Sequence, residues 1–149
     1  MVLQSDKLKR VFVGTKAGWL YQINYFTRLM EGIYQVHESS ICSLSISPGF
    51  CVSGSEDQFL RVWPLDFSEF ILEAKHEGIV VGLDISLNGL EVACGTSTGG
   101  LAILDLGNQN YKTILRSHTE EIAGMEWHTF SDSIITLSRD LTIRIWFFY

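Results

Sequence analysis

Residues His37–Trp63, HESSICSLSISPGFCVSGSEDQFLRVW, decide how the rest of this chain is interpreted. Two short apolar runs, Ile41–Ser47 and Cys51–Gly54, flank a Ser-Pro-Gly turn. A third run, Phe59–Trp63, follows the acidic turn Glu56-Asp57-Gln58. Short apolar runs bounded by Gly, Pro, Ser and Asp are typical of strands and turns. The stretch therefore predicts three consecutive strands.

The same pattern returns from His118 to Trp146, HTEEIAGMEWHTFSDSIITLSRDLTIRIW. The His and the Trp are 26 residues apart in the first copy and 28 in the second, and in both copies an Asp precedes the Trp by six residues. A weaker copy lies between them, from His76 to Leu104. A repeat of about 40 residues with several short strands in each unit is typical of propeller blades.

These three copies resemble the WD40 repeat family, and the resemblance extends from about Val11 to the end of the chain. It implies an all-β fold, a partial WD40 β-propeller of about three and a half four-stranded blades. We expect a partial, degenerate blade over residues 1–36 and a WD repeat blade over 37–75. A degenerate WD repeat blade over 76–117 and a WD repeat over 118–149, truncated before its last strand, would follow.

The first unit is predicted to be incomplete. Val11–Gly14 and Trp19–Asn24 match the middle strands of a blade, and its first strand is expected to be absent or distorted. An incomplete array of blades exposes apolar faces and strand edges at its ends. Three explanations stay open: a segment of a larger propeller, a short product of a longer gene, or two copies that close a seven-bladed ring. The last predicts self-association through the unfinished blade edges.

Composition excludes several classes of protein. The net charge of −6 and the pI near 5.1 argue against nucleic-acid or membrane partners. The three cysteines, Cys42, Cys51 and Cys94, have no zinc-type spacing, so we expect small buried apolar residues in a reducing compartment, with neither metal nor cofactor. The N-terminus lacks the apolar core of a signal peptide, and no run approaches the length of a membrane helix. The chain is therefore expected to be cytoplasmic.

The family resemblance also implies two buried structural tetrads. Each consists of a His, a hydroxyl, an Asp and a Trp. The Trp indole would donate to the hydroxyl, which bonds the His ring, whose other nitrogen reaches the Asp. The members are His37, Ser53, Asp57 and Trp63 in one copy and His118, Thr136, Asp140 and Trp146 in the other.

A hydroxyl, a His and an Asp also suggest a hydrolase triad. The set occurs twice at the same position of the repeat, however, and an enzyme rarely builds its site once per repeat. Residues 51–55, Cys-Val-Ser-Gly-Ser, also lack the first glycine of a nucleophile elbow. We therefore expect no catalytic residues and no enzyme.

The middle copy lacks most of this pattern. Cys94, Thr98 and Leu104 take the hydroxyl, Asp and Trp positions, which leaves His76 alone. We expect this histidine to be partly solvated, and the blade to be held by packing.

The loops after each His and the Asp-containing turns are expected to form one protein-binding face. This candidate partner-binding face comprises Glu38, Glu56, Glu77, Glu120, Glu121 and Arg139. It is mainly acidic, which favours basic partner segments. On the opposite face, Phe50 or Phe130 would be exposed as an anchor or tucked under the blade.

The run from Val11 through Phe70, VFVGTKAGWLYQIN to FLRVWPLDFSEF, further resembles large centriolar and ciliary WD-repeat proteins. This implies a non-catalytic scaffold that binds centriolar or microtubule-associated proteins during cilium assembly. The implied location is the cytoskeleton, at the centrosome, centriole or cilium base. The alternative is a peptide-binding WD40 adaptor, a substrate receptor or signalling scaffold unrelated to cilia.

Overall fold

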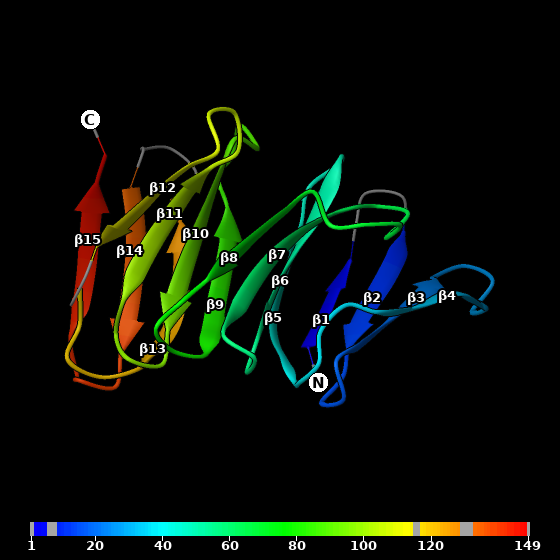
Figure 1. Cartoon of the computed structure of the whole chain (residues 1–149), viewed down its shortest axis with the longest axis horizontal. Coiled ribbons are helices and arrows are strands. Elements are labelled where there is room, and N and C mark those ends of the chain that lie inside the picture. The colour runs from blue at the N-terminus through cyan, green and yellow to red at the C-terminus, as the bar shows by residue number, and fades with distance from the viewer. Residues whose placement is uncertain (1, 6–8, 115–116, 129–132, 149) are drawn as a thin grey trace.

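The computed structural model describes residues 2–5, 9–114, 117–128 and 133–148, which form fifteen β-strands in four antiparallel sheets (Figure 1). The all-β prediction is confirmed. The first sheet consists of β1 (Val2–Ser5), β2 (Arg10–Gly14), β3 (Trp19–Asn24) and β4 (Met30–Gln35). The second consists of β5 (Ile41–Ile46), β6 (Phe50–Ser55), β7 (Phe59–Pro64) and β8 (Leu72–Lys75). The third consists of β9 (Val80–Ile85), β10 (Glu91–Thr96), β11 (Leu101–Asp105) and β12 (Asn110–Ile114), and the fourth of β13 (Ile122–Trp127), β14 (Ser133–Ser138) and β15 (Ile143–Phe147).

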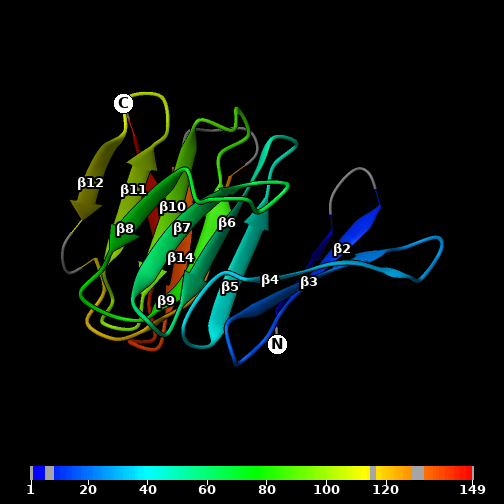
Figure 2. The ribbon, with the colours of Figure 1, turned by 45° about the vertical axis from the view of Figure 1, so that its right-hand side comes forward.

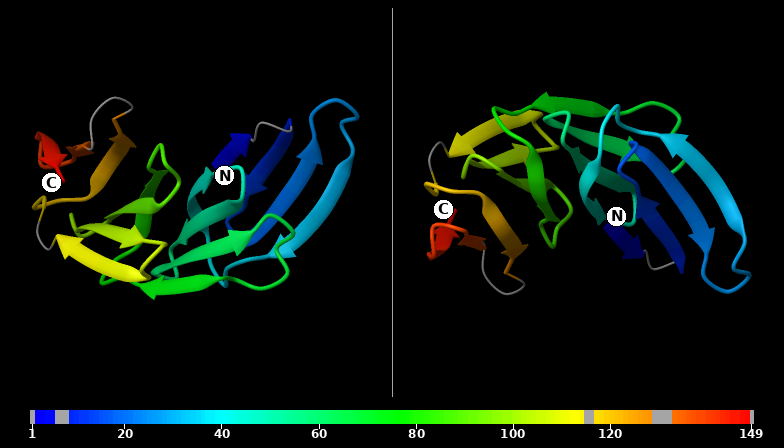
Figure 3. Two further views of the ribbon diagram at one scale, coloured as in Figure 1. Left: turned by 90° about the horizontal axis from the view of Figure 1, so that it is seen from above. Right: turned by 90° about the horizontal axis from the view of Figure 1, so that it is seen from below.

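Each sheet is a meander in which every strand pairs with the next one in the sequence. The turns between second and third strands hold a residue with positive φ in all four sheets: Gly18, Gln58, Gly99 and Leu141. A positive φ, which glycine adopts most easily, closes the tight turns that the Gly-rich and acidic segments predict. The sheets succeed one another in an arc, as the two end-on views show (Figure 3). The β3–β4 hairpin projects beyond the others (Figure 2).

The first sheet corrects one prediction. Its first strand is neither absent nor distorted, because β1 pairs regularly with β2, from Val2 opposite Gly14 to Ser5 opposite Val11. The sequence concealed this strand because polar residues follow Val2 and Leu3 at once, and no histidine precedes them to mark the start of a repeat.

Three apolar cores lie between the sheets. Phe12, Leu20 and Trp63 belong to the core between the first and second sheets. Val52, Val62 and related side chains form the next core with the third sheet. Ala93, Ile103, Trp127 and Ile134 form the last core, which packs the third sheet on the fourth. Each sheet thus buries its faces only against its neighbours in the sequence, as blades do.

Three glycines permit this close packing. A Cβ on Gly14, Gly54 or Gly95 would lie 2.8, 2.3 or 3.0 Å from the side chain of Ile41, Val80 or Ile122, which begins the following sheet. In the fourth sheet, Leu137 takes this position: it pairs with Ile143 as Gly54 pairs with Leu60. Leu137, Ile143 and Ile145 are about half exposed or more, at 47%, 68% and 55%. The outer face of the fourth sheet is therefore apolar and open to solvent.

Candidate functional site

The structure brings the four residues of the first predicted tetrad together. Trp63 on β7 donates its indole N–H to Oγ of Ser53 on β6 at 2.9 Å. The same Oγ lies 2.7 Å from Nε2 of His37, and Nδ1 of His37 lies 2.9 Å from Oδ2 of Asp57. An Nδ1–H tautomer satisfies these three contacts, since it donates to the carboxylate while Nε2 accepts from the hydroxyl.

The second tetrad has the same geometry. The indole N–H of Trp146 donates to Oγ1 of Thr136 at 2.9 Å, and that oxygen lies 2.7 Å from Nε2 of His118. Nδ1 of His118 lies 2.9 Å from Oδ2 of Asp140. Thr142 adds a hydroxyl donor to Asp140, at 2.6 Å from Oδ1.

Each repeat histidine joins two successive sheets. The backbone N–H of His37 donates to the carbonyl of Gly18 in the first sheet, at 3.2 Å, while its ring contacts the second sheet. The N–H of His118 likewise donates to Gly99 of the third sheet, at 2.9 Å, and its ring contacts the fourth. The tetrads therefore fix the spacing between sheets as well as the turns within them.

The ionisation of the tetrads suits this structural role. Burial lowers the pKa of His37, although Asp57 opposes that effect, so the ring stays neutral. Burial raises the pKa of Asp57, but the Phe59 and Glu38 N–H groups and the His37 ring outweigh it and lower the pKa overall. The Thr142 hydroxyl is the main cause that holds the pKa of Asp140 well below its usual value. Both carboxylates are therefore charged acceptors at neutral pH.

The hydroxyls of the tetrads are placed poorly for nucleophilic attack. Ser53 and Thr136 are 0% exposed, and each oxygen already accepts an indole N–H. A substrate has no access to either oxygen. Nor do the cysteines replace them, because Cys51 and Cys94 are buried and Cys42 is half-buried. Burial raises the pKa of the Cys51 thiol to about 12, so it stays protonated.

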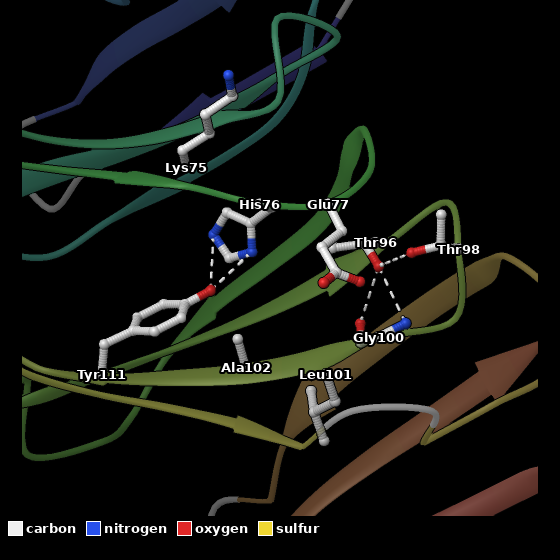
Figure 4. A pocket seen from close by; sticks show the side chains of 9 residues that line it. All are labelled: Lys75, His76, Glu77, Thr96, Thr98, Gly100, Leu101, Ala102 and Tyr111. Atoms are coloured by element: carbon white, nitrogen blue, oxygen red, sulfur yellow. Dashed lines mark hydrogen bonds between the residues drawn. The ribbon is translucent and has the colours of Figure 1, made fainter.

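The middle repeat differs from its prediction. His76 is not partly solvated but 7% exposed, and it has partners. The Tyr111 hydroxyl lies 2.7 Å from its Nδ1, and Sγ of Cys94 lies 3.6 Å from Nε2. Tyr111 lies on β12, and Figure 4 shows its hydroxyl facing the His76 ring. A polar aromatic residue on a different strand thus takes over the contact with the ring.

A pocket of about 220 Å³ opens beside this His76–Tyr111 pair (Figure 4). Thr96 and Thr98, whose hydroxyl oxygens lie 3.0 Å apart, form one wall. Glu77 and Lys75 lie at its rim, and Gly100, Leu101 and Ala102 complete the lining. The sequence analysis identified the replaced tetrad positions but missed this pocket. One feature of the sequence pointed to the pocket: Ala102 occupies the position at which the two repeats with complete tetrads have Arg61 and Arg144.

The residues of the candidate partner-binding face lie in loops along one edge of the sheets, the lower edge in Figure 1. Backbone hydrogen bonds join the two loops of each repeat, such as Glu56 N–H to Ser40 and Arg139 N–H to Glu121, both at 2.9 Å. Exposed side chains on this edge are Glu38, Glu56, Glu77, Glu120 and Arg139. Glu121 is half-buried, and its Oε2 lies 3.4 Å from Nε of Arg139.

On the opposite edge, Phe50 is half-buried and packs against the core between the second and third sheets, so it is tucked under the blade. Phe130 lies outside the described residues. Within the described part of the chain, the structure has no helix with the length and apolarity that a membrane crossing requires. The same residues gather no group of three or more His, Cys, Asp or Glu side chains that could hold a metal ion.

Comparison with known proteins agrees with this repeat geometry. The profile of the family described as "WD domain, G-beta repeat" matches residues 30–64 and 109–146. The chain belongs to the WD40 repeat family. The two matched segments contain Trp63 and Trp146, the tryptophans of the two tetrads.

Its relatives include a WD repeat-containing protein and a centriole proteome protein. The chain is 36% identical over 157 residues to WD repeat-containing protein 90 of Xenopus tropicalis, and 42% identical over 109 residues to centriole proteome protein 16 of Chlamydomonas reinhardtii. These matches cover 93% and 73% of this chain but 8% and 5% of the relatives. The resemblance to large centriolar WD-repeat proteins is confirmed, and the chain spans less than a tenth of the length of these relatives.

The fold is also that of solved WD40-like propellers. A chain in the crystal structure of the mitotic checkpoint complex aligns with a TM-score of 0.89 at 17% identity, over 99% of this chain and 48% of that one. At this identity the likeness shows the fold alone.

Proposed function

We propose that this chain is a non-catalytic scaffold segment that binds other proteins through the loops of its lower edge. The observation that supports this most is that hydrogen bonds hold the sheets together while the loops of the lower edge expose charged side chains. The tetrad histidines join adjacent sheets through bonds of 2.7–3.2 Å, while Glu38, Glu56 and Glu120 extend into solvent. Rigid elements that present variable loops are a common arrangement for binding.

The same geometry supports a non-catalytic role. The two hydroxyl–His–Asp sets are engaged in the packing of the blades, with the hydroxyls at 0% exposure. Turnover would require Thr136 or Ser53 to leave its indole partner, which would leave that N–H unpaired in the interior.

We place this scaffold at centrioles or the base of cilia, in cilium biogenesis, with centriolar or microtubule-associated proteins as its partners. The support is the relationship to WD repeat-containing protein 90 and centriole proteome protein 16. With a net charge of −6 the chain is poorly suited to acidic surfaces, including nucleic acid and anionic membranes. Basic segments of centriolar proteins fit its rim better.

Localisation in ciliated cells tests this assignment. The chain, fused to a fluorescent protein, is expected to coincide with a centriolar marker, and the double substitution Glu120→Lys, Glu121→Lys should reduce that signal. Glu69→Lys is the matched control, because Glu69 is exposed in the β7–β8 loop on the opposite edge. Diffuse fluorescence of the unmodified chain would contradict the centriolar assignment.

The alternative is a WD40 adaptor that binds a short peptide outside cilia. It shares the acidic rim and differs in location, so diffuse fluorescence together with salt-dependent binding of basic peptides would favour it. Co-sedimentation of the purified chain with microtubules separates direct tubulin binding from binding through another protein.

We also propose self-association through the open face of the fourth sheet. Leu137, Ile143 and Ile145 present apolar side chains at positions that are buried in the preceding sheets. Light scattering behind a sizing column should give a mass above that of one chain, and Ile145→Glu should restore the monomer. A monomer for both proteins would contradict this proposal.

A further inference from the structure

The second and fourth sheets each hold an arginine two residues before the tetrad tryptophan. Arg61 on β7 donates from Nη1 to the carbonyl of Val36 at 2.7 Å, and from Nε to Oε2 of Glu73 at 2.6 Å. Arg144 on β15 donates from Nη1 to the carbonyl of Ser117. Val36 and Ser117 immediately precede the repeat histidines. The repeat thus has a fixed position for a guanidinium group.

The third sheet lacks this guanidinium. Ala102 occupies the arginine position, and its methyl group has no donor for the carbonyl of Lys75, the residue before His76. Leu104 is likewise smaller than the Trp of the tetrads, and Thr98 replaces the charged Asp with a neutral hydroxyl. The pocket of about 220 Å³ lies at these positions, and the Ala102 side chain is part of its lining.

We propose that this pocket binds an arginine side chain supplied by a partner protein, in the place where the adjacent repeats hold their own. The inference builds on the proposed protein-binding function and assigns it a site and a residue type. The partner's guanidinium would take the position that Ala102 leaves empty, at the acidic rim of the sheets.

The lining of the pocket suits a guanidinium group. Glu77 supplies a carboxylate at the rim, where Figure 4 shows it between the His76 ring and the Thr96–Thr98 wall. Thr98 supplies a hydroxyl acceptor, and the ring of Tyr111 offers an aromatic surface for a cation. Arginine is preferred to lysine because its planar group donates several hydrogen bonds in fixed directions.

Two basic side chains line the pocket, and neither places a positive charge beside the His76–Tyr111 pair. Lys75 points away from the His76–Tyr111 pair (Figure 4), and its Nζ lies 5.6 Å from the centre of the Phe59 ring. His76 is neutral at pH 7, because burial lowers its pKa to about 4. Glu77 therefore sets the charge at the mouth of the pocket.

Titration with blocked arginine, N-acetyl-arginine methylamide, tests the proposal on the full chain. In NMR spectra we expect shifts of the signals from Glu77, Thr98 and Tyr111. N-acetyl-citrulline methylamide, which has the same shape without the charge, should bind at least about tenfold more weakly, since bonds to ionised donors are the stronger ones. Equal affinity for the two ligands would overturn the proposal.

Two substitutions locate the site. Ala102→Arg supplies the guanidinium within the chain, as in the adjacent sheets, and should abolish binding of blocked arginine. Glu77→Gln, at an exposed rim residue, should weaken binding about tenfold through loss of the charged acceptor. Lys112→Arg, an exposed change in the same sheet, is the control and should bind normally.

Undiminished binding to Glu77→Gln would place the arginine elsewhere and overturn the assignment. The assay uses no centriolar partner, so its result is independent of the localisation experiment. If blocked arginine fails to bind while centriolar localisation is normal, arginine binding at the pocket is disproved and the proposed scaffold role is unaffected.

Discussion

The indole N–H of Trp63 donates to Ser53 at 2.9 Å, although ten residues separate the two along the chain. The contact spans the β6–β7 hairpin and places the hydroxyl where it also meets the ring of His37, at 2.7 Å. One oxygen thus satisfies a donor from within its own sheet and a ring nitrogen from the loop that arrives from the first sheet. Removal of the Ser53 hydroxyl should therefore lower the stability of the chain more than removal of an exposed hydroxyl.

Ser53→Ala should destabilise the chain by about 2–4 kcal/mol, because it leaves the Trp63 N–H and the His37 nitrogen unpaired in the interior. Urea unfolding followed by tryptophan fluorescence measures the loss. Ser68→Ala, at an exposed serine, is the control and should change stability by less than about 0.5 kcal/mol. Equal effects of the two substitutions would contradict the structural role of the tetrad.

Tyr111→Phe should destabilise the chain by about 1–2 kcal/mol, because it removes the hydroxyl that contacts His76 in the interior. The same unfolding assay applies. Tyr25→Phe provides a comparison at a residue that is 61% exposed, and it should be close to neutral. If both tyrosines proved equally dispensable, the third sheet would be held by apolar packing alone.

Stability should decrease as the pH falls from about 6.5 towards 4. Burial lowers the pKa of His76 to about 4 in the folded chain, so the unfolded chain binds its proton first and is favoured below pH 6.5. The loss attributable to this residue should reach about 2–3 kcal/mol at pH 4. His76→Gln should flatten this part of the profile; a slope unchanged by the substitution would assign the effect to other groups.

A second decrease should follow below about pH 4. The pKa values of Asp57 and Asp140 are lowered in the folded state, so their contribution is complete above the unfolded value and is lost as acid protonates the folded carboxylates. Asp140→Asn should remove part of this second step in urea titrations at pH 2 to 5. A profile identical to that of the unmodified chain would mean that the carboxylate contributes no net stability.

Gly18→Ala should cost at least about 2 kcal/mol, because Gly18 has φ +78° and a Cβ there would lie 2.0 Å from the carbonyl oxygen of His37. The nearest atoms belong to the backbone of His37 and Ser39, so no side-chain movement can relieve the clash. Gly49→Ala is the matched control, since a Cβ there would meet nothing within 4 Å. The midpoint of thermal unfolding should be clearly lower for Gly18→Ala than for Gly49→Ala. Similar midpoints would contradict the close contact between this turn and the His37 backbone.

The repeat spacing was sufficient to predict the fold, because His37, His76 and His118 mark the same position in successive units. It failed at β1, where no histidine marks the start and polar residues obscure the alternation. It also failed for Tyr111. The partner of His76 comes from the fourth strand of the sheet, whereas the tetrad pattern leads one to look at the third. A contact between strands distant from the motif depends on packing, which the spacing of the motif does not encode.

Leu137 has a consequence for any polypeptide that continues this arc. In the three earlier sheets, glycine at this point admits the isoleucine or valine with which the next sheet begins. A leucine side chain occupies that space, so a strand that docks here in the same way must bring a residue smaller than valine. The surface of the last sheet therefore discriminates by size among the strands that cover it, and a copy of the second, third or fourth sheet of this chain would be rejected.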